Sequence, residues 1–78
     1  MNERDRQELA DIQARHPEAR IDLIRARKER GVKQYEAAAI LNVAWPYYSM
    51  IELGEILPYA ELAARIERLL GVNVLKED

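Results

Sequence analysis

Few residues in this chain could take part in covalent or acid–base chemistry. The 78 residues include one histidine, His16, and one serine, Ser49, but no threonine and no cysteine. Nucleophilic catalysis needs a nucleophile beside a base, so these two residues supply almost no material for it. The 14 Asp and Glu residues could exchange protons, but in a chain rich in helix-forming residues most carboxylates are solvated surface charges. We therefore expect a binding protein and not an enzyme.

Length and composition point to one small globular domain. A chain of this size buries only about 60% of the surface that it exposes when unfolded, which leaves room for a single core. Without cysteine neither disulfides nor thiolate zinc sites can form, so we expect packing to hold the fold, with no metal and no cofactor. No apolar run approaches the ~18 residues of a membrane span, and residues 2–6 lack the apolar stretch of a signal peptide. We expect a cytoplasmic protein without membrane contact.

The charges are distributed unevenly along the chain. The net charge of −2 argues against unspecific binding to nucleic acid. Residues 15–33 nevertheless hold seven Lys or Arg against three Asp or Glu, a local charge of +4, whereas residues 34–64 hold no Lys or Arg at all. The first segment could face phosphates, and the second could not do so through side-chain cations.

The sequence predicts helices throughout, because Ala, Leu, Glu and Arg dominate and β-branched residues never alternate over a useful length. Expected helices cover about residues 3–15, 17–30, 34–41, 45–53 and 58–70. Asn2 caps the first, and Pro17 fits the first turn of the second. The later helices end at residues that tolerate a left-handed backbone, namely Gly31, Asn42, Gly54 and Gly71. We divide the chain into an N-terminal helix extension, residues 1–16, and a domain of residues 17–78.

Apolar spacing predicts which helix faces meet in the core. The expected core residues are Leu23, Ala26, Ala38, Leu41, Val43, Tyr48, Ile51, Leu62, Ile66, Leu69 and Leu70. Two short apolar pairs remain, Leu9 with Ile12 and Ile21 with Ile24, each spaced by three residues. We expect these pairs to cover each other, either within one chain or across a dimer.

Residues 31–43 and 47–54 carry a recognisable pattern. Ala38 is small enough for two helices to cross closely, and Asn42 turns the chain between them. With these residues the chain resembles the helix-turn-helix of the phage repressor and Cro family, also called the XRE family, over about residues 21–72. The resemblance implies a compact, all-α, lambda-repressor-like fold of five helices with an extra N-terminal helix. It also implies a small sequence-specific DNA-binding transcription regulator of phage or prokaryotic origin, acting as a dimer.

The resemblance also assigns roles to single residues. It implies a structural salt bridge between Arg27 and Glu52, and a phosphate contact for Gln34 at the start of a helix. The helix that follows Asn42 would enter the DNA major groove. With the neighbouring basic residues, the expected DNA-binding set is Lys28, Lys33, Gln34, Ala44, Trp45, Pro46, Tyr47, Ser49, Met50 and Leu53.

One departure from the family pattern supports an alternative function. Members of the family place long polar side chains on the recognition helix, whereas the outward positions here offer a single hydroxyl, that of Ser49. Glu55 follows in a loop where the family commonly has basic residues. A protein partner could therefore bind an apolar surface formed by Trp45, Met50, Leu53, Ile56 and Leu57. A homodimer could form through the N-terminal helix or through this same surface.

Overall fold

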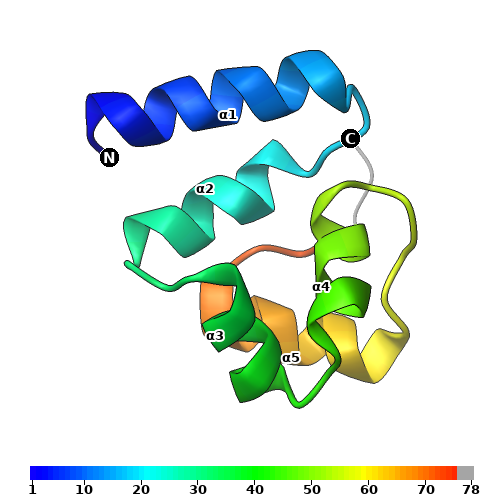
Figure 1. The fold of residues 1–78 in the computed structure, drawn as a ribbon. Helices are drawn as coiled ribbons and strands as arrows, with labels where there is room; N and C mark the ends of the chain where they lie inside the picture. The colour runs from blue at the N-terminus through cyan, green and yellow to red at the C-terminus, as the bar shows by residue number, and fades with distance from the viewer. Residues whose placement is uncertain (76–78) are drawn as a thin grey trace.

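The computed structural model describes residues 1–75, which form five helices and no strand. The helices are α1 (Glu3–Arg15), α2 (Ile21–Glu29), α3 (Gln34–Leu41), α4 (Trp45–Glu52) and α5 (Ala60–Leu70) (Figure 1). Helices α1 and α2 lie side by side, and α2 separates α1 from the other three helices. The predicted all-α, five-helix fold is therefore confirmed.

The core lies among α2, α3, α4 and α5. Ala37 and Ala38 are fully buried on α3, where their small side chains let α4 approach closely. Asn42 ends α3 with φ 58°, in the left-handed conformation that the sequence predicted, and Val43 N then donates to Ala38 O at 3.0 Å. The expected core residues all lie in this cluster, with Val43 and Leu69 partly buried against it.

Helix α1 packs on α2 within the same chain. Leu9 and Ile24 are buried, at 5% and 1% exposure. The two leftover apolar pairs therefore cover each other within one chain and do not need a dimer. The α1 helix begins where Asn2 Oδ1 accepts a hydrogen bond from Asp5 N, as the sequence predicted. Lys28 Nζ of α2 reaches Glu8 Oε2 of α1 at 2.6 Å, so an ion pair adds to the apolar contact.

The start of α2 differs from the prediction. The helix begins at Ile21 and not at Pro17, because long-range contacts occupy the preceding segment. Arg20 N donates to Glu52 O at 2.7 Å, and the Arg20 guanidinium donates to Val74 O. Gly54, with φ 75°, lies so close to this segment that a Cβ atom there would be 2.0 Å from Glu18 O. These contacts hold residues 17–20 against the end of α4.

Helix α5 also begins later than expected, at Ala60 and not at Pro58. Tyr59 keeps an extended backbone with ψ 159° and occupies the N-cap position without a side-chain capping hydrogen bond, while Pro58 is buried ahead of it. The predicted end is confirmed, since Gly71 takes φ 72° after Leu70.

The ion pair between α1 and α2 should make the docking of α1 sensitive to acid. The hydrogen bond and charge of Lys28 lower the pKa of Glu8 below its ordinary value of 4.5. A carboxylate with a lowered pKa in the folded state stabilises above its unfolded pKa and loses that contribution as pH falls through the folded value. We expect α1 amide chemical shifts, followed by NMR, to report weaker docking as pH drops below 4.5.

The variant Glu8→Gln should lack this step in its titration, and Glu3→Gln, on the same helix, should keep it. Identical pH curves for the native chain and Glu8→Gln would contradict the role of the pair.

Candidate nucleic-acid interface

Helix α4 presents one face to the core and the other to solvent. Tyr48, Ile51 and Glu52 are buried, which fixes the rotation of the helix about its axis. Pro46 lies in the first turn, where its missing N–H leaves no helical hydrogen bond unmade. On the outward side Ala44, Trp45, Pro46 and Met50 are exposed, and Tyr47, Ser49 and Leu53 are half-buried.

A buried ion pair ties α4 to α2. Arg27 Nε donates to Glu52 Oε2 at 2.6 Å, and Arg27 Nη2 donates to Glu52 Oε1 at 3.2 Å. The Arg27 Nη1 atom donates to Val32 O at 2.9 Å, so the guanidinium also fixes the turn before α3. The contact expected from the resemblance is thus present, and its bidentate geometry sets the position of α4 relative to α2.

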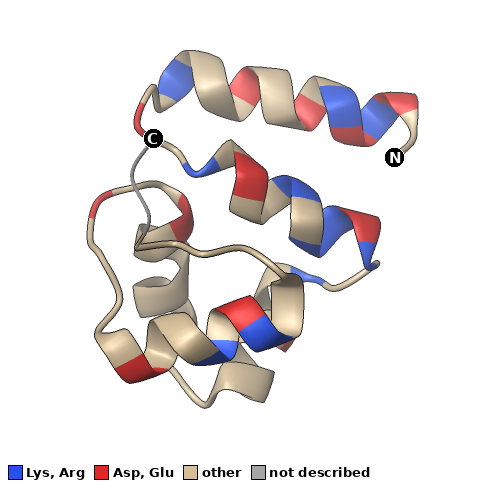
Figure 2. Ribbon diagram, turned by 180° about the vertical axis from the view of Figure 1, so that it is seen from behind, with Lys and Arg blue, Asp and Glu red and all other residues tan. Residues whose placement is uncertain are grey.

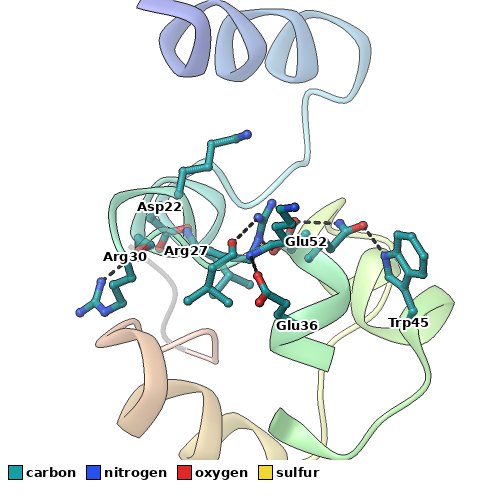
Figure 3. Close-up of polar contacts among 12 residues, drawn as sticks. Asp22, Arg27, Arg30, Glu36, Trp45 and Glu52 are labelled. Atoms are coloured by element: carbon teal, nitrogen blue, oxygen red, sulfur yellow. Dashed lines mark hydrogen bonds and ion pairs between the residues drawn. The ribbon is translucent and has the colours of Figure 1, made fainter. Parts of the chain in front are cut away.

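Gln34 extends this pair to the protein surface. Its Nε2 atom donates to Glu52 Oε1 at 2.9 Å, and its Oε1 atom accepts from Trp45 Nε1 at 2.7 Å. Figure 3 shows Trp45 at the outer end of the resulting hydrogen-bond chain, which begins at Arg27. Both the nitrogen and the oxygen of the Gln34 amide are hydrogen-bonded to other side chains of the same chain, so Gln34 positions Trp45.

Tyr48 stands beside the ion pair with its phenol buried. No hydrogen-bond partner reaches its hydroxyl among the described residues. Burial, with the nearby Glu52 carboxylate, raises the pKa of Tyr48, because the phenolate would be poorly solvated there. Tyr48 therefore stays protonated and acts as a packing residue of the core.

Two aromatic rings gather at the N-terminal ends of α3 and α4. The centroids of Tyr35 and Trp45 are 5.7 Å apart with a tilt of 57°, and Lys33 Nζ lies 6.0 Å from the centre of the Tyr35 ring. The sequence reading did not single out Tyr35. Its only sequence signal is an aromatic residue directly after Gln34, which is too common to indicate a site.

The two lysines of the expected interface have different surroundings. Lys28 is held by Glu8 at 2.6 Å and lies 3.9 Å from Asp5, so α1 neutralises it. Lys33 is exposed just before α3, where its backbone N–H donates to Glu36 Oε1. Figure 2 shows Lys and Arg along α1, α2 and α5, whereas α3 and α4 carry none.

The apolar residues of the alternative protein-binding surface differ in how far they are exposed. Ile56 packs partly against the core, whereas Leu57 points to solvent with 68% exposure. Glu55 is also exposed there. Of the five residues proposed for that surface, Trp45, Met50 and Leu57 are exposed, and Leu53 is half-buried.

Within residues 1–75 no helix has the length and apolar character needed to cross a membrane. No three His, Cys, Asp or Glu side chains in that range come together as metal ligands.

A comparison with protein families gives one match. The model described as "Helix-turn-helix" matches residues 23–76, from the first turn of α2 to beyond α5. Helix α1 lies outside the matched range. No curated protein and no solved structure gives a match.

Proposed function

We propose that this chain, which belongs to the helix-turn-helix family of DNA-binding transcription regulators, is a small sequence-specific regulator of the phage repressor and Cro type. Its ligand is double-stranded DNA, in the cytoplasm of a prokaryotic cell. The family consists of regulators and not of enzymes, which agrees with the scarcity of nucleophiles in the sequence.

One observation supports the proposal above all: one face of α4 is anchored in the core, and the opposite face is turned to solvent. The Arg27–Glu52 pair and the buried face of α4 anchor the helix, and Trp45, Pro46 and Met50 remain exposed on its outward side. An α-helix with its side chains is about 10–12 Å across, and the major groove of B-DNA, about 12 Å wide, admits such a helix. Lys33 is exposed, and its Nζ lies 6.0 Å from the centre of the Tyr35 ring, which is next to Trp45, so it could meet a phosphate beside this face.

We further propose a homodimer on DNA, because one α4 can read only one half-site. The apolar side of α1 is covered by α2, so α1 offers little for an interface. Leu57 and Tyr59, at 68% and 53% exposure, are exposed residues between α4 and α5 that could meet across a two-fold axis. In a binding titration we expect two protomers per duplex.

The proposal predicts salt-dependent binding with few phosphate contacts. Fluorescence anisotropy of a labelled duplex, repeated over a salt series, should give a shallow slope of affinity against salt, because the slope counts neutralised phosphates. Lys33→Gln should reduce this slope by about one, since it removes one phosphate contact. Lys28→Gln is the matched control: the same charge is lost, but Lys28 is already paired with Glu8, so the slope should not change.

Equal slopes for Lys33→Gln and the native chain would contradict the phosphate contact. Absence of binding to every duplex would reject DNA recognition and favour a second candidate, a protein partner on the apolar surface of Trp45, Met50, Leu53, Ile56 and Leu57. That candidate is supported by the lack of Lys and Arg in residues 34–64 and by the exposed Glu55, which repels phosphate.

A further inference from the structure

The outward face of α4 has almost no group that could hydrogen-bond to a base edge. Ala44, Pro46 and Met50 bring no strong donor, and Pro46 lacks even a backbone N–H. The indole N–H of Trp45 is taken by Gln34 at 2.7 Å. The hydroxyls of Tyr47 and Ser49 remain, both on half-buried residues, and Tyr47 packs partly against the core. Direct readout by this face therefore rests mainly on apolar contact.

Trp45 is held in place before any ligand arrives. Its indole nitrogen is bound to Gln34, Gln34 is bound to Glu52, and Glu52 is fixed by Arg27 in the interior. Trp45 remains 52% exposed at the first position of α4. A fixed aromatic ring loses little conformational entropy on binding, so it can act as an apolar anchor.

The apolar group on the major-groove edge of DNA is the 5-methyl of thymine, which the other three bases lack. We propose that Trp45 and Met50 read thymine methyl groups, so that the sequence preference of this chain is a preference for thymine. This inference rests on the proposed DNA-binding function. Lys33 is exposed, and its Nζ lies 6.0 Å from the centre of the Tyr35 ring, which is next to Trp45, so its charge favours an anionic occupant such as DNA over a neutral or basic protein surface.

The test uses the full chain and a duplex selected by it from a random library. Thymines in the selected consensus are replaced one at a time by uracil, which removes the methyl and keeps every hydrogen-bonding group. We expect one or two positions at which uracil lowers affinity about fourfold, the effect of one buried methyl. Replacement elsewhere should have no effect.

Variants of the protein assign each methyl to a side chain. Met50→Ala and Trp45→Ala should each bind the thymine and uracil duplexes equally well at the position that the lost side chain contacts. Ile40→Ala is the control, because it removes a 61% exposed apolar side chain from α3 and should keep the full uracil effect. Circular dichroism on each variant checks that the fold is retained.

Three results would overturn the inference. Sequence-specific binding that uracil leaves unchanged would reject methyl readout alone and leave the proposed function standing. A uracil effect of the same size in the native chain and in both α4 variants would assign the preference to DNA shape. No binding to any duplex would reject the proposed function together with the inference, and would point to a protein partner.

Discussion

Replacing Glu52 by alanine is expected to lower the free energy of unfolding by about 3–5 kcal/mol, the typical cost of removing one partner of a buried ion pair. Arg27 would keep its charge at 8% exposure without a counter-charge, and the Gln34 amide would lose its acceptor as well. A single core in a chain of this size supplies only about 3–5 kcal/mol, so the variant should be close to unfolding at room temperature. Urea denaturation followed by circular dichroism measures the loss.

Glu55→Ala is the matched control, since Glu55 is exposed three residues further along and forms no ion pair among the described residues. Its free energy of unfolding should stay within about 0.5 kcal/mol of the native value. The double variant Arg27→Met, Glu52→Leu should recover much of the stability, because neither buried charge remains. Equal midpoints for Glu52→Ala and Glu55→Ala would show that the pair contributes nothing.

Gly54→Ala is expected to be the second most damaging single substitution. A Cβ atom at Gly54 would lie 2.0 Å from Glu18 O and 2.8 Å from Glu18 C, so backbone must move, and the φ of 75° adds strain for any L-residue. We expect a loss of about 3 kcal/mol, measured as a shift in thermal midpoint. The displaced segment carries Arg20, whose N–H bonds Glu52 O at the end of α4.

Gly31→Ala separates strain from collision. Gly31 has a similar φ of 67°, but nothing lies within 4 Å of the added Cβ. Its cost should be only the left-handed backbone term of about 1 kcal/mol. A Gly54→Ala variant as stable as Gly31→Ala would mean that the segment before α2 yields freely.

The sequence predicted those parts of the fold that local chemistry decides. Asn2 caps α1 with its side chain, and Asn42 ends α3 with its left-handed backbone. The predicted start of α1 and the predicted end of α3 were therefore correct. The predicted start of α2 was wrong, because the local signal of Pro17 is overridden by a distant contact. That contact is the hydrogen bond from Arg20 N to Glu52 O. No local pattern contains a contact between residues so far apart in sequence.

The candidate site divides in the same way. The Arg27–Glu52 contact followed from the family resemblance, which carries long-range information that periodicity lacks. The link from Gln34 to Trp45 was not foreseen, because it depends on the rotamers of two long side chains on different helices. For the same reason the sequence did not show that Lys28 is paired with α1 while Lys33 is free of any ion pair in residues 1–75.

The chain has a single tryptophan, and it stands at the outer end of the hydrogen-bond chain that begins at Arg27. All indole fluorescence of the protein therefore originates at the first residue of α4. A ligand covering that face changes the polarity around the ring directly, whereas a disturbance at Arg27 or Glu52 reaches it only through Gln34. Trp45 is thus an intrinsic fluorescent probe of this face. Quenching of its fluorescence by a small solute can distinguish a ligand bound on α4 from a broken Arg27–Glu52 pair without any added dye.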